Sequence, residues 1–280
     1  EELMAIPIIK DWEKYFANPH EGLGSSYERI ILNDLVFRIA DTYGIHSALE
    51  TPAFGFTGIS GINLVGLAKR GIKVNLEDHD ENRLEQINAV WQSLGLQLRS
   101  KLNTSYQYLD YPDKSIDLGF NFSAIWFVQD LPLFLAELSR VCSKCILICV
   151  PNRSGLGYKM QIKEFSPQLY PYLHLSYIDP FSIQYLLCLQ GWKLIETDYI
   201  DCPPWPDIGM PKELWLAKLK GKTTSISETR AKPISILPYY CEEDPGFAKK
   251  MHSLSFVERL APNWFKRFWA HHRYMLFIPD

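Results

Sequence analysis

The sequence lacks the features that mark several broad classes of protein. No apolar run reaches the roughly 20 residues needed to span a bilayer, so no transmembrane segment is expected. Neither sign of charge is in large excess, because 29 basic and 32 acidic residues give a net charge of −3, which argues against a protein that coats nucleic acid. The first residues show no basic segment or cleavage pattern typical of a signal peptide. We therefore expect a cytoplasmic globular protein without nucleic-acid partners.

The sequence has few of the cysteine arrangements that bind metals or carry out redox chemistry. Four of the six cysteines fall inside apolar segments. Cys142 and Cys145 form one Cys-x-x-Cys pair, but a structural zinc site needs about four ligands and no second pair exists. A redox pair would favour a helix amino terminus, whereas this pair ends a predicted helix. We therefore expect reduced thiols with a structural role.

Strand-like and helical patterns alternate from about residue 45 to 200, which predicts a doubly wound α/β fold with a mainly parallel sheet. Ser26 is expected to cap the first long helix, Gly44 to end it, and Asp80 to cap the helix after the second strand. The expected strands are 72–78, 98–105, 116–122, 145–150, 192–200 and 273–278, and the main helices are 27–43, 62–70, 131–141, 179–190 and a stretch around 246–260.

A glycine-rich segment and an acidic residue follow two successive predicted strands. Glycines stand at positions 55, 58 and 61 after the strand that ends in Glu50, and Asp78 ends the next strand. In a doubly wound sheet both features lie at the carboxyl edge. Glycine lets the backbone approach a ligand, and a carboxylate can accept hydrogen bonds from ribose hydroxyls. The pattern predicts a nucleoside site, with a tight turn that holds no ligand as the alternative.

Four segments resemble the successive motifs of class I S-adenosylmethionine-dependent methyltransferases: 48–58, 78–84, 111–118 and 150–152. The resemblance implies a seven-stranded Rossmann-like sheet with an antiparallel last strand, and S-adenosylmethionine as the cofactor, with S-adenosylhomocysteine as its product. We expect an N-terminal helical segment at 1–44, a cofactor-binding core at 45–202, a cap at 203–268 and the last strand within 269–280.

The resemblance also implies roles for individual residues. Glu50 would orient the glycine loop and the methionine amino group, Asp78 would bind the ribose hydroxyls, and His79 would lie against the adenine. The remaining implied cofactor-binding residues are Gly55, Thr57 and Gly58 under the cofactor, Ser105 and Tyr106 beside the adenine, and Asn121 at the methyl-transfer region.

Two departures from the family pattern leave alternatives open. The loop after Glu50 is longer than usual, so either Gly55–Gly58 or Gly58–Gly61 plays the usual part. Ser105 stands where the family usually has an acid. The rival functions are a methyltransferase-like binding protein that has lost turnover and a nicotinamide-dependent oxidoreductase, although the latter favours Gly-x-Gly-x-x-Gly.

The substrate side has no obligatory motif, because in methyl transfer the cofactor carries most of the reactivity. His174, in an aromatic segment after the fifth strand of the core, is the candidate base. The candidates for the substrate pocket are Tyr15, Tyr27, Arg29, Trp126 and Trp205. For each of them the alternative is a packed position in the core.

Two further features lie near the end of the chain. His271 and His272 are adjacent and should point to opposite faces of a strand, so no metal site is expected without neighbouring ligands. Residues 249–273 interleave basic and aromatic side chains. For this stretch we favour helices with a buried apolar stripe over contact with a membrane. Aromatic residues are denser over residues 151–280 than over the cofactor half, 47–150, which predicts a small apolar or aromatic acceptor.

Overall fold

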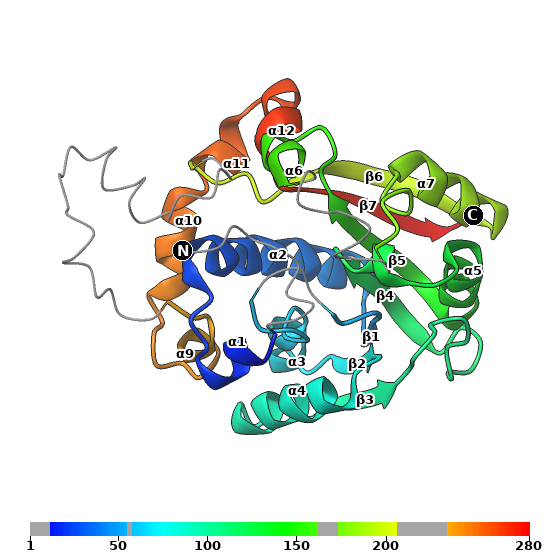
Figure 1. Cartoon of the computed structure of the whole chain (residues 1–280), viewed down its shortest axis with the longest axis horizontal. Coiled ribbons are helices and arrows are strands. Elements are labelled where there is room, and N and C mark those ends of the chain that lie inside the picture. Colours follow the sequence, from blue (N-terminus) through cyan, green and yellow to red (C-terminus); the bar gives the residue numbers. More distant parts are fainter. Residues whose placement is uncertain (1–11, 55–57, 162–172, 206–233) are drawn as a thin grey trace.

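A seven-stranded sheet forms the centre of the computed structural model, which describes residues 12–54, 58–161, 173–205 and 234–280 (Figure 1). The strand order is β3-β2-β1-β4-β5-β7-β6, and β7 pairs antiparallel with both of its neighbours while the other pairings are parallel. The expected doubly wound sheet with an antiparallel last strand is therefore confirmed. The strands are β1 (Ser47–Glu50), β2 (Lys73–Asp78), β3 (Arg99–Leu102), β4 (Ile116–Phe122), β5 (Cys142–Pro151), β6 (Trp192–Ile200) and β7 (His272–Pro279).

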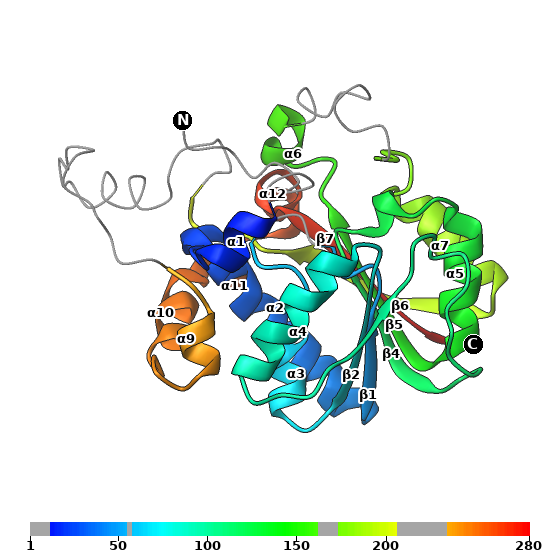
Figure 2. The same cartoon turned by 60° about the horizontal axis from the view of Figure 1, so that its bottom comes forward.

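Helices cover both faces of the sheet (Figure 2). One core cluster joins α2, α3 and α4 to one face, and a second joins α5 and α7 to the other. The helices are α1 (Glu13–Ala17), α2 (Gly22–Tyr43), α3 (Val65–Lys69), α4 (Glu81–Ser93), the short 3₁₀ helix η1 (Ile125–Phe127), α5 (Leu131–Val141), α6 (Leu156–Gln161), α7 (Pro180–Leu189), α9 (Leu237–Tyr240), α10 (Phe247–Leu254), α11 (Phe256–Leu260) and α12 (Asn263–Trp269).

The interior strand β5 is buried on both faces, as its continuous apolar run predicts. Cys142 is both the C-cap of α5 and the first residue of β5, so the Cys-x-x-Cys pair begins at the end of a helix, as predicted, and continues into a strand. Ladder hydrogen bonds between Ile116 and Cys142 draw the chain into the sheet directly after Val141. Both cysteines of the pair are free and buried.

Helix boundaries follow the expected capping residues in two of three cases. Gly44 ends α2 in the left-handed conformation at φ 59°, and the Asp80 side chain accepts a hydrogen bond from the Arg83 backbone N–H at 3.0 Å. The prediction for Ser26 was wrong, because α2 begins at Gly22 and Ser26 is a buried residue within the helix. The extra turn places Glu21 at the helix start, where it reaches the glycine loop.

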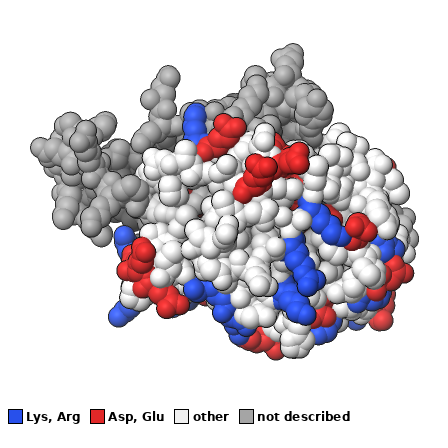
Figure 3. Space-filling view, turned by 90° about the horizontal axis from the view of Figure 1, so that it is seen from below, with Lys and Arg blue, Asp and Glu red and all other residues white. Residues whose placement is uncertain are grey.

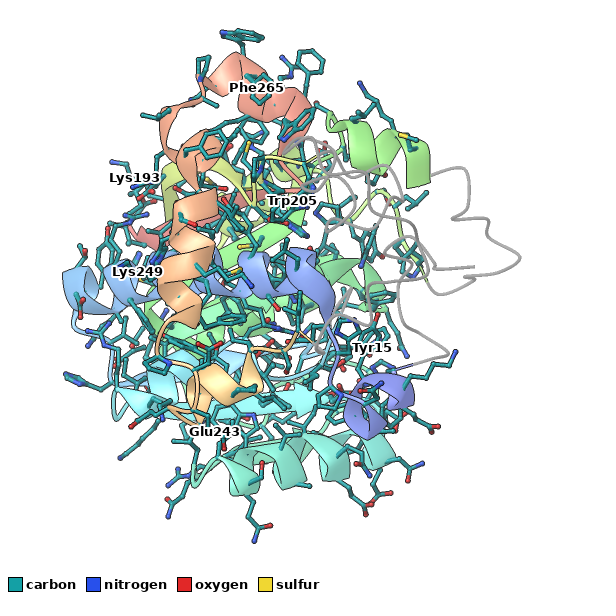
Figure 4. All side chains as sticks on the ribbon, turned by 90° about the vertical axis from the view of Figure 1, so that its left-hand side faces the viewer. Tyr15, Lys193, Trp205, Glu243, Lys249 and Phe265 are labelled. Atoms are coloured by element: carbon teal, nitrogen blue, oxygen red, sulfur yellow. The ribbon has the colours of Figure 1, made fainter. Side chains whose placement is uncertain are left out.

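The basic and aromatic stretch divides into three helices with different surroundings. Phe247 and Met251 of α10 are buried, so a buried apolar stripe is confirmed there. Helix α12 buries none of its residues: Trp264 is 69% exposed and Phe268 is 55% exposed, and Figure 4 shows Phe265 at this outer end of the molecule. The favoured interpretation was therefore wrong for α12, whose apolar side chains lie outside the core.

The surface carries charge of both signs. On the face seen in Figure 3, basic and acidic side chains are interspersed, with no broad field of one sign. Within the described residues, no helix combines the length and apolar character required to cross a membrane.

Candidate functional site

The chemistry-bearing side chains gather at the carboxyl edge of the sheet. β1 ends at Glu50, β2 at Asp78 and β4 at Phe122, and these strands are parallel, so their ends share one edge. This is the edge at which doubly wound proteins bind ligands. The side chains form one group around Glu50, one around Asp78 and one beyond β4.

Glu50 is buried at the centre of a hydrogen-bonded network. Its Oε1 accepts a hydrogen bond from Asn63 Nδ2 at 2.6 Å, and Asn63 Oδ1 accepts one from Arg29 Nη1 at 2.6 Å. Arg29 Nε in turn donates to Glu21 Oε1 at 2.8 Å. Glu50 Oε2 is buried and has no hydrogen-bond partner among the described residues. Burial raises the pKa of Glu50 to about 8, although Asn63 and Arg29 oppose the rise.

The described glycines of the loop contact protein side chains at close range. Gly58 has φ +72°, and a Cβ at this position would collide with the Glu21 carboxylate. Gly61 has φ +71° and packs against Ile87. Gly55 and Thr57 lie outside the described residues.

Asp78 is buried and paired with a buried cation. Its Oδ2 accepts a hydrogen bond from Arg83 Nε at 2.8 Å, and its Oδ1 accepts one from Arg83 Nη2 and another, at 2.9 Å, from the Asp80 backbone N–H. The Arg83 guanidinium lies 4.2 Å from the centre of the Phe54 ring. Arg83 is thus held by charge on one side and by an aromatic face on the other.

Aromatic rings line the position beside Asp78 where the adenine was expected. His79 Nδ1 lies 3.0 Å from the Tyr106 hydroxyl oxygen, and the Phe54 ring makes edge contacts with His79 and Phe127. Burial lowers the pKa of His79, which favours a neutral imidazole. The Tyr106 N–H donates to Asn103 Oδ1 at 2.8 Å, in a turn that also contains Ser105.

Beyond β4, two expected residues come together through the backbone. The His174 N–H donates to the Trp126 carbonyl oxygen at 2.8 Å, and the His174 ring stacks on Tyr177 with ring centres 4.7 Å apart. Asn121 is committed to the scaffold, because its amide donates to the Thr51 carbonyl oxygen at 2.8 Å and accepts from the Ala124 N–H at 3.3 Å.

A second aromatic pair lies between α2 and the end of β6. Tyr27 and Trp205 are buried with ring centres 5.5 Å apart, and the Tyr27 hydroxyl donates to Glu258 Oε2 at 3.3 Å. Figure 4 shows Trp205 next to α2. Tyr15, on α1, is half-buried against the core cluster that contains α2, and Figure 4 shows it apart from Trp205. Tyr15 and Trp205 therefore do not share one pocket wall.

Sequence reasoning missed several residues that organise the site. Glu21 and Asn63 carried no signal, because their partners lie in other segments of the chain. Arg83 had a weak signal, since it stands in the first turn of the helix that follows Asp78. Asp201 had a strong one: it comes directly after strand 192–200, just as Asp78 ends the second strand.

Comparisons with known proteins agree with this geometry. Residues 57–146 match the family model described as a methyltransferase domain. A proposed sarcosine dimethylglycine methyltransferase from Galdieria sulphuraria superposes with a TM-score of 0.52 at 13% identity, covering 88% of this chain and 84% of that one. A proposed methyltransferase from Haloferax volcanii, solved with the Trm112 activator, gives 0.51 at 12% identity, covering 96% and 98%.

A third similar structure has a different printed activity. The [4+2]-cyclase SpnF superposes with a TM-score of 0.50 at 10% identity, covering 89% of this chain and 80% of that one. No curated protein sequence matches the chain. At these identities the structural likenesses show the fold.

Proposed function

We propose that this chain is a class I S-adenosylmethionine-dependent methyltransferase and that it methylates a small apolar or aromatic acceptor, held beyond the end of β4. The single observation that carries the placement of the cofactor is the buried Oε2 of Glu50, which has no hydrogen-bond partner among the described residues. A buried carboxylate oxygen without a partner is costly, so a cationic ligand that bonds to it is strongly favoured. The ammonium of the methionine moiety is such a ligand.

Asp78 can also bind the ribose of the cofactor, but through one hydroxyl and not through both. A carboxylate offers about four acceptor sites. Three of those on Asp78 are used by two Arg83 nitrogens and the Asp80 N–H. One ribose hydroxyl can therefore bind Asp78 while the Arg83 pair stays intact. His79, Tyr106 and Phe54 supply the aromatic walls for the adenine.

The bound cofactor supplies a methyl group on a sulfonium, which is reactive without a metal or a covalent enzyme intermediate. The chain then has to orient the acceptor and exclude water. Tyr27, Trp205 and Trp126 provide buried aromatic surface at this end of the sheet. His174, held by the Trp126 carbonyl, would accept the proton of an acceptor that loses one.

Titration calorimetry with S-adenosylmethionine and S-adenosylhomocysteine tests the cofactor placement. Glu50→Gln should weaken both affinities tenfold or more, which is about 1.4 kcal/mol. Glu77→Gln is the matched control, because Glu77 is equally buried on the neighbouring strand and its Oε2 is already bonded to Thr51 and Asn103. Equal effects of the two substitutions would contradict the role of Glu50.

Transfer of labelled methyl groups to a panel of small phenols, indoles and aliphatic acids tests the acceptor. We expect turnover with aromatic members and a loss of at least tenfold in kcat/KM for Trp205→Ala. Turnover only with charged aliphatic acceptors would contradict an apolar pocket. Cofactor binding without transfer to any member would favour a protein that binds the cofactor for another purpose.

A further inference from the structure

Three side chains from distant segments of the chain meet near the carboxyl edge of the sheet. Glu28 comes from α2, Asp201 follows β6, and His272 begins β7. His272 Nδ1 lies 3.8 Å from Glu28 Oε2 and 3.9 Å from Asp201 Oδ2. One ligand atom from each residue fits within a mutual distance of 4.8 Å, and all three residues are buried.

The charges in this cluster are not balanced by a paired lysine or arginine. Within the described part of the chain, neither Glu28 nor Asp201 forms an ion pair with Lys or Arg. The nearby Arg29 directs its guanidinium to Glu21, Asn63 and the Ile59 carbonyl. Asp201 Oδ1 is buried and accepts no hydrogen bond from any described residue. Two close carboxylates in a dry site repel each other, and a cation between them would remove that cost.

We propose that Glu28, Asp201 and His272 bind a divalent first-row transition metal ion, such as Zn²⁺ or Mn²⁺. Carboxylate oxygens and imidazole nitrogens are both ligands that such ions take. Ligands at about 2.0–2.2 Å from a tetrahedral ion stand about 3.3–3.6 Å apart. The separations of 3.8 and 3.9 Å from His272 therefore need movements of only a few tenths of an ångström, while the Glu28 and Asp201 oxygens, within 4.8 Å of each other, close by up to about 1.5 Å.

The neighbouring residues support this assignment. His271 Nδ1 lies 2.6 Å from Asp201 Oδ2, and a hydrogen bond from a second residue commonly orients a metal-binding carboxylate. The Phe122 ring, at the carboxyl end of β4, lies 4.6 Å from the His272 ring, so the site adjoins the edge of the sheet that holds the other chemistry. Three protein ligands leave a coordination position for water or for an oxygen of a small molecule.

Metal titration of the untagged full chain tests the proposal. After treatment with a chelator, the chain is titrated with ZnCl₂, MnCl₂ or CoCl₂ by calorimetry, and Co²⁺ binding is also followed by its visible absorption. We expect one ion per chain. Glu28→Gln and His272→Ala should each reduce the affinity at least tenfold and change the Co²⁺ spectrum. His252→Ala is the matched control, because His252 is partly exposed and pairs with Asp34 at 2.8 Å.

Each outcome of the titration either supports the metal site or overturns it. Glu28→Gln has nearly the same shape as the parent side chain, so it keeps the test valid if His272→Ala fails to fold. Absence of stoichiometric binding of all three ions to the wild-type chain would overturn the proposal. So would a Glu28→Gln variant that binds metal as tightly as the wild type, or a loss of binding confined to His252→Ala. Calorimetry with metal alone needs no methyl transfer, so this result is independent of the proposed function.

Discussion

Two groups of buried carboxylates at the same edge of the sheet differ in how their negative charge is neutralised. Asp78 is neutralised within the chain by Arg83, which donates two hydrogen bonds to it. Glu28 and Asp201 face each other and a histidine, with no arginine or lysine of the described residues paired to them. The charge of the first arrangement is balanced without a ligand, whereas the second is the one at which we propose an external cation. Burial of an acid at a sheet edge therefore does not by itself indicate a ligand; the partner of the acid decides.

The largest test of this comparison is Arg83→Leu. Removal of one partner of a buried ion pair leaves an uncompensated charge and costs about 3–5 kcal/mol. We expect a loss of that size in the free energy of unfolding, measured by urea denaturation. Arg38→Leu is the matched control, because its bidentate pair with Glu196 is partly exposed. It should cost only about 0–1 kcal/mol.

A double variant sharpens the same test. Arg83→Leu combined with Asp78→Leu removes both charges, so most of the lost stability should return if the cost comes from the orphaned carboxylate. Additive losses in the double variant would mean that Arg83 stabilises the fold through packing on Phe54 instead. The affinity for S-adenosylmethionine should fall in the double variant, because Asp78, the proposed ribose partner, is gone.

Glu50 shares a feature with each group: its Oε1 is hydrogen-bonded within the chain, and its Oε2 has no partner among the described residues. The pH dependence of stability should report this buried acid. Burial raises its pKa to about 8 from the ordinary value of 4.5, so the folded chain holds this proton more tightly than the unfolded chain. The resulting stabilisation is full below pH 4.5 and is lost as the pH rises through about 8. The stability of wild type relative to Glu50→Gln should therefore fall between these values, by up to about 5 kcal/mol. Denaturation curves at a series of pH values measure it.

Glu137 provides a control of opposite sign. The Arg140 hydrogen bond lowers the pKa of Glu137, so its contribution is present above the unfolded pKa and is lost on acidification. The stability of wild type relative to Glu137→Gln should thus rise with pH. If both variants gave the same slope, a general effect of net charge would explain the data, and the buried position of Glu50 would not.

The sequence predicted the fold well where periodicity and capping act locally. The expected ranges 116–122, 131–141 and 192–200 coincide with β4, α5 and β6, because alternation, a capping Asp130 and Gly191 mark their limits. The partners of the buried acids could not be predicted in this way. Glu28 and His272 are at opposite ends of the chain, and only the order of the sheet brings β7 beside β6 and under α2. Pairing of this kind depends on tertiary packing, which local patterns do not encode.

The smallest expected effect concerns the cap that positions Arg83. Asp80→Ala removes the side-chain acceptor of the Arg83 N–H, and Asp130→Ala removes the equivalent acceptor of the Leu133 N–H at the start of α5. Each should cost about 1 kcal/mol of stability. Only Asp80→Ala should also change the affinity for S-adenosylmethionine, by about two- to threefold, because the first turn of α4 carries the partner of Asp78. Calorimetry on the two variants measures this, and equal affinities would show that the Asp80 cap does not position Arg83.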